Sequence, residues 1–273
     1  MVIPPPVQTG DHIGARFASD DDFLAAAAGF AHAGADRRAQ VMLVPSPRLR
    51  GPLGDRLGAS GALRDALGEG RLHVMDPGEV QLAGGGFDPG RLHAAYREAA
   101  RAATGAGHPG LWVAVDMTWA RPGVVDADAL VAFEAAANTL FTPGTLTALC
   151  AYDTRVFPPA LAFRACQAHP AIAEAARFGH RVTADGLAFS GEADVTNALA
   201  WTALLGSLAP DHHVVDISAM SFLGARALTD LAATAGAHPR PLTIRATARQ
   251  VTRLSLLKID RLAAVEVLPA RTA

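Results

Sequence analysis

The fold of this chain is limited above all by an alternation of short apolar segments with alanine-rich stretches across residues 11–172. Segments 40–44 (QVMLV) and 111–116 (LWVAVD) are apolar at nearly every position, which is typical of strands that are buried on both faces. Stretches 21–35 and 88–106 instead repeat apolar residues at helical spacing. Strands that alternate with helices in this way predict a parallel α/β sheet with helices on both faces.

A second pattern begins after residue 178. Two short alternating segments flank Asp185-Gly186, a dipeptide that favours a tight hairpin, and helical and apolar stretches follow in turn. The order β-β-α-β-α-β-α-β predicts a second, smaller α/β domain. The sequence therefore predicts a disordered proline-rich arm at 1–10, a first domain at 11–172, a linker at 173–178 and a second domain at 179–273.

Composition excludes several classes of protein. The formal net charge is −2, so the chain is not a strongly basic nucleic-acid binder. No apolar run reaches the roughly 18 residues that span a bilayer. The first ten residues lack the basic and apolar regions of a signal peptide. We expect a cytoplasmic protein with neither a nucleic-acid nor a membrane partner.

The sequence shows no spacing that is typical of a catalytic or metal site. Its two cysteines, Cys150 and Cys166, form no CxxC pair, and its ten histidines form no HExxH motif. A GxSxG motif is also missing from the sequence. We therefore expect no enzyme activity, no catalytic residue, no metal and no cofactor.

Three motifs in the second domain resemble those of one family. Residues 191–194 (GEAD) resemble its GELD turn, and residues 216–228 (DISAMSFLGARAL) are similar to its strand-turn-helix signature. Residues 251–260 (VTRLSLLKID) resemble its last helix. On these motifs the domain is identified as a member of the STAS family of anti-sigma-factor antagonists. The resemblance implies a STAS α/β fold that binds an anti-sigma factor, a switch-protein kinase or another STAS protein.

The signature turn departs from that family at the site of control. In the family a serine of this turn is phosphorylated, and the added charge breaks docking to the partner. Neither aligned position has a hydroxyl here, so control by phosphoserine is expected to be lost. Ser221 is the best substitute, although its hydroxyl can instead satisfy a backbone group at the strand end. The predicted partner-binding turn comprises Ser221, Gly224, Ala225 and Arg226.

The first domain resembles another family. Its motifs are residues 12–17 (HIGARF), 87–92 (FDPGRL), 116–120 (DMTWA) and 149–153 (LCAYD). Together they are similar to MEDS, a sensory module named from a methylotroph regulator and proposed to sense hydrocarbon derivatives. The resemblance implies a RecA-like α/β/α fold and a small-molecule ligand. The family often has cysteine where Gly14 stands, and its absence weakens the case for metal or thiol sensing.

A RecA-like fold raises an alternative function, nucleotide binding. Residues 12–24 stand where a phosphate loop would be, and Asp116 ends an apolar strand as a metal-binding acid would. However, no GxxxxGK[ST] motif is present, and the single lysine, Lys258, belongs to the other domain. The run 20–22 (DDD) would repel phosphate. The alternative is therefore a nucleotide- or small-molecule-binding protein with weak or no NTPase activity that uses STAS for assembly.

Several residues of the first domain are candidates for ligand contact. His12 can meet a ligand at the carboxyl edge of the sheet, where open α/β folds bind ligands, or be a capped, partly buried histidine. Trp119 can line a pocket or cover the sheet edge, and Glu134 can face a cavity or a solvated helix surface. Tyr152 shares strand parity with Cys150, which is expected to be a small core residue. The predicted sensor site comprises His12, Phe17, Asp116, Trp119, Glu134 and Tyr152.

Overall fold

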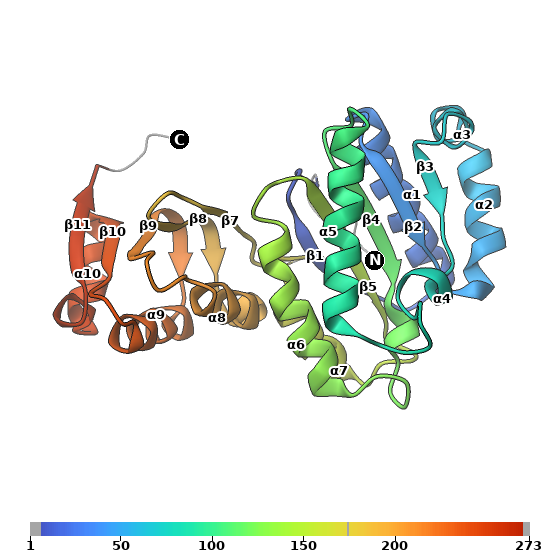
Figure 1. Cartoon of the computed structure of the whole chain (residues 1–273). Helices are drawn as coiled ribbons and strands as arrows, with labels where there is room; N and C mark the ends of the chain where they lie inside the picture. The colour runs from blue at the N-terminus through green and yellow to red at the C-terminus, as the bar shows by residue number, and fades with distance from the viewer. Residues whose placement is uncertain (1–6, 174, 270–273) are drawn as a thin grey trace.

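The computed structural model describes residues 7–173 and 175–269 and contains two sheets (Figure 1). The first sheet has the strand order β3-β2-β4-β5-β1-β6, and every neighbouring pair is parallel. This confirms the predicted parallel sheet. Its strands are β1 (His12–Phe17), β2 (Gln40–Val44), β3 (Leu72–Val74), β4 (Leu111–Asp116), β5 (Leu146–Asp153) and β6 (Ala171–Ile172).

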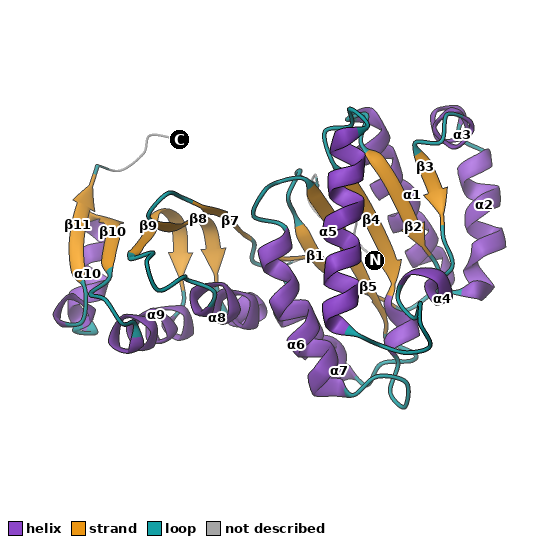
Figure 2. Ribbon diagram, in the orientation of Figure 1, coloured by secondary structure: helices purple, strands orange, loops and turns teal. Residues whose placement is uncertain are grey.

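Helices cover both faces of this sheet, as the sequence predicts (Figure 2). They are α1 (Asp20–Asp36), α2 (Arg50–Gly58), α3 (Gly61–Gly68), α4 (Pro77–Val80), α5 (Pro89–Gly105), α6 (Ala127–Ala137) and α7 (Pro159–Gln167). One core lies under α1, α2 and α3 and includes Phe23 and Leu53. The other lies under α5, α6 and α7 and includes Leu92 and Leu130. Strands β4 and β5 are buried along their whole length because both cores cover them.

Side-chain caps fix where several of these helices begin. Ser19 accepts a hydrogen bond from the backbone nitrogen of Asp22 and so caps α1 as predicted. Asp88 caps α5 and Asp126 caps α6 through their own carboxylates. Each cap satisfies backbone N–H groups that have no partner inside the helix, so the local sequence sets these boundaries.

The second sheet has the order β11-β10-β9-β8-β7, in which only the β7–β8 pair is antiparallel. Gly186 begins β8 so close to β9 that a side chain there would clash with the carbonyl oxygen of Val214. The elements are β7 (Phe178–Val182), β8 (Gly186–Ala193), α8 (Ala198–Gly206), β9 (Val214–Leu223), α9 (Ala225–Ala237), β10 (Thr243–Thr247), α10 (Ala248–Leu256) and β11 (Ala264–Leu268). The three helices pack on one face of the sheet around Trp201 (Figure 1).

The two parts of the chain are joined by direct contacts as well as by the covalent link. The carbonyl oxygen of Pro170 accepts from the backbone nitrogen of Phe178 and from the side chain of Asn197. Arg177 forms an ion pair with Asp11. Helix α8 also packs against α6 and α7. The second part therefore rests on the end of the first sheet where β1 begins.

The structure differs from the sequence expectation at the N-terminal arm. Residues 1–6 of the predicted arm lie outside the described residues, but Val7 is buried and the backbone nitrogen of Gly10 donates to the hydroxyl of Thr147. Residues 7–10 are therefore packed rather than disordered, because Val7 adds apolar surface to the core under α1. Within residues 7–173 and 175–269, no helix combines the length and apolarity needed to cross a membrane.

Candidate functional site

A small cavity lies between the first sheet and helices α5 and α6. Its volume is about 40 Å³, which is room for a few non-hydrogen atoms. Apolar side chains of the sheet and of both helices form most of the wall. They include Leu92, Val113, Val115, Phe133, Ala137, Leu146 and Ala148.

Glu134 of α6 is the centre of a buried polar cluster beside this cavity. Its Oε2 atom lies 3.3 Å from Nε2 of His12, the first residue of β1, and 3.4 Å from Nε2 of His169, which follows α7. The Cys150 thiol of β5 lies 3.7 Å from the same His12 nitrogen and 3.8 Å from Glu134 Oε2. One donor atom from each of these four buried residues lies within 4.8 Å of the others. We call these four residues the Glu134 cluster.

The outer hydrogen bonds of the two imidazoles fix where their hydrogens are. Asn138, in the short helix η3 (Asn138–Leu140), donates its Nδ2 to two backbone carbonyls, so its Oδ1 accepts from His12 Nδ1 at 2.8 Å. Nδ1 of His169 donates to a backbone carbonyl of α7 at 2.9 Å. In the neutral form, each ring therefore has its hydrogen on Nδ1 and directs the lone pair of Nε2 toward Glu134.

Tyr152 sets the orientation of the central carboxylate. Its hydroxyl donates to Glu134 Oε1 at 2.8 Å, so Oε2 remains turned toward the histidines. Tyr152 and Cys150 project from the same side of β5, as their strand parity predicts. Burial raises the pKa of the Tyr152 hydroxyl well above its ordinary value, so this group stays a hydrogen-bond donor at neutral pH.

Burial and neighbouring charges set the protonation of the Glu134 cluster. Burial, with a smaller contribution from His169, lowers the pKa of His12 to about 4, so this imidazole is neutral at pH 7. Burial alone would raise the pKa of Glu134, but the positive charge that His169 or His12 carries when protonated outweighs burial and lowers that pKa. The ionised form of Glu134 therefore needs a positive charge beside it to offset its burial.

Three residues that line the cavity each have a buried polar atom without a hydrogen-bond partner among the described residues. These atoms are Gln81 Oε1, His93 Nε2 and Trp119 Nε1. The amide nitrogen of Gln81 donates to the hydroxyl of Tyr96 at 2.9 Å, which leaves only the amide oxygen unpaired. A buried polar atom without a partner costs about 1–3 kcal/mol. A ligand atom that pairs with one of these groups would remove that cost.

The structure brings four of the six predicted sensor residues to this site. His12, Glu134 and Tyr152 belong to the Glu134 cluster or contact it, and Trp119 lies in the cavity wall. The expected position of His12 at the carboxyl edge is wrong, because it begins β1 at the amino edge. A solvated helix surface for Glu134 is excluded as well, since its side chain is 1% exposed.

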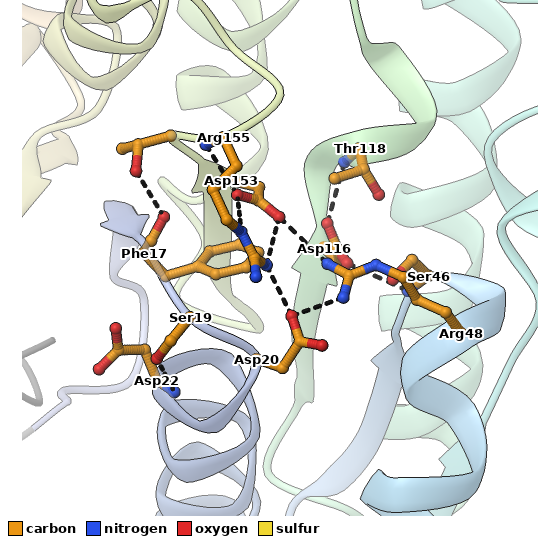
Figure 3. Close-up of polar contacts among 11 residues, drawn as sticks. Phe17, Ser19, Asp20, Asp22, Ser46, Arg48, Asp116, Thr118, Asp153 and Arg155 are labelled. Atoms are coloured by element: carbon orange, nitrogen blue, oxygen red, sulfur yellow. Dashed lines mark hydrogen bonds and ion pairs between the residues drawn. The ribbon is translucent and has the colours of Figure 1, made fainter.

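The other two predicted residues, Phe17 and Asp116, lie outside the site. Phe17 has the opposite strand parity to His12 and packs against Phe23 on the other face of the sheet. Asp116 ends β4 and accepts from the backbone nitrogens of Ser46 at 3.3 Å and Thr118 at 3.0 Å (Figure 3). Its carboxylate is therefore occupied in joining two loops.

The carboxyl edge of the first sheet carries an ion network (Figure 3). Asp153, which ends β5 and is buried, lies 2.7 Å from Arg155 and 3.1 Å from Arg48. Both arginines also bind Asp20 in the first turn of α1. Burial opposes ionisation of Asp153, but the Arg155 guanidinium outweighs it and lowers the pKa of this carboxyl. Charged side chains that pair with one another therefore occupy the sheet edge where a phosphate loop would bind phosphate.

Sequence reasoning missed His169 and Asn138. The Glu134 cluster is assembled from β1, α6, β5 and the turn after α7, so no short spacing reveals it. Gly14 and Cys150 are paired in register across β1 and β5. The thiol of Cys150 therefore reaches the site from the neighbouring strand. The site contains a thiol even though position 14 is not a cysteine.

The residues of the predicted partner-binding turn lie together at one end of the second sheet. They are Ser221 in β9, and Gly224, Ala225 and Arg226 where α9 begins. The hydroxyl of Ser221 donates to the carbonyl oxygen of Gly191 at 3.0 Å, which is the backbone role left open by the sequence. Arg226 is exposed and pairs with Asp230 at 2.8 Å.

Comparison with known proteins bears on the first domain. None of the curated proteins matches this chain. A family model does match: MEDS, described as the MEthanogen/methylotroph, DcmR Sensory domain, covers residues 11–170. These residues hold the cavity and the whole Glu134 cluster. The match spans more than half of the sequence, so the chain belongs to the MEDS family of sensory domains. This confirms the family that the sequence motifs of the first domain predict.

Proposed function

We propose that this protein is a cytoplasmic signalling sensor, without catalytic activity, whose first domain binds a small and largely apolar molecule with one hydroxyl group. The observation that carries this proposal is the apolar cavity, three of whose lining residues have an unpaired buried polar atom. A hydroxyl can accept from the indole N–H of Trp119 and donate to the amide oxygen of Gln81. The sensory family of the domain supports the same function.

A titration of the full chain with methanol, ethanol, propanol and butanol tests the proposal. We expect saturable binding that raises the thermal midpoint and depends on chain length, because the cavity is small. Trp119→Phe removes the indole donor and should weaken binding about fivefold, the equivalent of roughly 1 kcal/mol for one hydrogen bond.

Trp112→Phe is the matched control, because Trp112 is equally buried but belongs to the core on the other face of the sheet. Its affinity for the alcohols should equal that of the wild-type chain. The proposal would be abandoned if no alcohol bound saturably, or if both tryptophan variants lost affinity equally.

We further propose that the second domain is a STAS domain that acts as an anti-sigma-factor antagonist. The three sequence motifs lie close together in space, which supports this. Gln250 of α10, the residue before the last motif, donates to the carbonyl oxygens of Ile217 and Met220 in β9, so the helix that carries this motif contacts the signature strand. Ser221 connects the same strand to Gly191 of the first motif. The proposed partner is an anti-sigma factor or switch-protein kinase, with another STAS protein as the alternative.

Binding of an anti-sigma kinase from the source organism, measured by calorimetry, tests this output. Arg226 is exposed at the start of α9, so Arg226→Asp should weaken binding at least about tenfold by reversing a charge at the docking surface. Arg240→Asp, in the loop before β10, is the control and should bind normally. Equal affinity of both variants would exclude this turn as the docking surface.

Nucleotide binding is the second candidate function. Its support is a parallel sheet in which β1 lies between β5 and β6 and leads directly into α1, as in RecA-like folds. The ion network of Asp153, Arg48, Arg155 and Asp20 opposes it, because its carboxylates would repel phosphate. A thermal shift of several degrees with ATP or GTP and Mg²⁺ would favour this function over the sensor.

A further inference from the structure

The Glu134 cluster has an electrostatic problem that ligand binding in the cavity does not solve. Two Nε2 atoms, of His12 and His169, face one carboxylate oxygen at 3.3 Å and 3.4 Å. Both rings have their hydrogen on the far nitrogen, so in their neutral form these near nitrogens are acceptors. Acceptor atoms that face one another in a buried site repel unless a cation lies between them.

The distances match those expected around a tetrahedral metal ion. Bonds of about 2.0–2.3 Å to nitrogen, oxygen and sulfur place ligand atoms roughly 3.3–3.7 Å apart. The histidine nitrogens lie 3.3 Å and 3.4 Å from Glu134 Oε2, and the Cys150 sulfur lies 3.7 Å and 3.8 Å from its neighbours. The donor atoms as a set lie within 4.8 Å of one another, so the side chains must shift inward to complete such a site.

The surroundings of the cluster are also those of a metal site. Ligating histidines donate their other ring nitrogen to an oxygen acceptor, and here Asn138 and a backbone carbonyl accept from the two rings. Tyr152 holds the second carboxylate oxygen of Glu134. Nε2 of His169 is fully buried, aimed at this carboxylate, and has no hydrogen-bond partner among the described residues.

We propose that His12 Nε2, His169 Nε2, Glu134 Oε2 and Cys150 Sγ form a binding site for one Zn²⁺ ion. Two imidazoles and a thiolate select a borderline transition ion over Ca²⁺ or Mg²⁺, which prefer oxygen ligands. Binding of the ion releases the thiol proton of Cys150 to solvent. The ion would connect β1, α6 and β5 to the turn between α7 and β6.

Metal titration of the full chain after chelator treatment tests this site without any organic ligand, so its result is separate from that of the sensor proposal. We expect one equivalent of Zn²⁺ to bind. Co²⁺ should bind at the same site and give the near-ultraviolet charge-transfer band of a thiolate ligand. Release of one proton per ion should accompany binding at neutral pH.

The two cysteines provide a matched pair of variants. Cys150→Ser should abolish the charge-transfer band and weaken Zn²⁺ binding by more than the 10–100-fold that is typical for changes around a metal site. Cys166→Ser removes the other buried thiol, which lies outside the Glu134 cluster, and should keep both properties. Tyr152→Phe should keep the band and weaken binding about 10–100-fold.

The wild-type titration alone can overturn the proposal, so the test does not depend on the folding of any variant. Binding of much less than one equivalent, or a Co²⁺ spectrum without a sulfur band, would exclude the site. Loss of the band in Cys166→Ser but not in Cys150→Ser would place the metal elsewhere. The wild-type chain could also bind no metal and instead hold one proton between the two histidines. That result would overturn the proposal, because the proton would then be the positive charge that offsets the repulsion.

Discussion

Nε2 of His180 in the second sheet lies 3.1 Å from the backbone carbonyl oxygen of Asn138 in the first domain. The side chain of the same asparagine holds His12 of the Glu134 cluster at 2.8 Å. One residue thus contacts both the candidate sensor site and the strand that begins the second sheet. A movement of His12 on ligand or metal binding would act directly on this junction, which gives a short physical route from the Glu134 cluster to the second sheet.

Asn138→Ala should destabilise the protein strongly. It leaves the Nδ1–H of His12 and the carbonyl oxygen of Ala168 without partners in a buried site, so we expect a loss of at least about 2 kcal/mol in the free energy of unfolding. Urea denaturation of the variant and the wild-type chain measures this difference in unfolding free energy. Thr139→Ala, at the exposed neighbouring position, should change stability by less than about 0.5 kcal/mol. Similar losses in both variants would contradict the role given to Asn138.

Acidification should weaken the protein through His180. Burial lowers the pKa of His180 in the folded chain below its ordinary value of 6.5. The unfolded chain therefore binds more protons as the pH falls below about 6.5, and stability is lost as the pH decreases toward the folded-state pKa. His180→Gln keeps a neutral donor, so its unfolding free energy should fall less than that of the wild-type chain between pH 7 and pH 5. If the unfolding free energies of the two chains fell equally between pH 7 and pH 5, the role given to His180 would be refuted.

Tyr152→Phe should cost more than an ordinary tyrosine deletion. The lost hydrogen bond is to the ionised carboxylate of Glu134, and such bonds contribute about 1.5–3 kcal/mol. Tyr96→Phe is the comparison, because its hydroxyl accepts from the neutral amide of Gln81, a bond of about 1 kcal/mol. Chemical denaturation of both variants gives the difference. An equal or smaller loss in Tyr152→Phe would show that Glu134 is not ionised.

Gly14→Ala should destabilise the site by crowding. A Cβ atom at position 14 would lie 3.0 Å from the ring of His169 and 3.2 Å from the Cα atom of Cys166. Overpacking of this kind costs typically about 1–3 kcal/mol, and His169 would have to move. Gly54→Ala in α2 meets nothing within 4 Å and should instead stabilise the helix by roughly 0.5–1 kcal/mol. In thermal denaturation, the midpoint should therefore fall in Gly14→Ala and rise in Gly54→Ala.

Local sequence determined most of the fold. The apolar run 111–116 coincides with β4, and Ser19 caps α1, since strand burial and helix capping depend on residues that are neighbours in sequence. Asp185-Gly186 likewise predicted the β7–β8 hairpin. The two-residue strand β6 was missed, because so short a segment has no periodicity and forms only by pairing with β1.

The site was only partly predictable. Strand parity correctly placed Cys150 and Tyr152 on one face, whereas the strand end occupied by His12 depends on the position of β1 in the sheet. The sequence by itself determined the parallel α/β architecture, the MEDS family and the apolar character of the first domain. Only the tertiary structure decided that His169, Asn138 and Glu134 meet. Polar groups from separate elements have no local signature, and they come together because a buried charge must find partners wherever the fold supplies them.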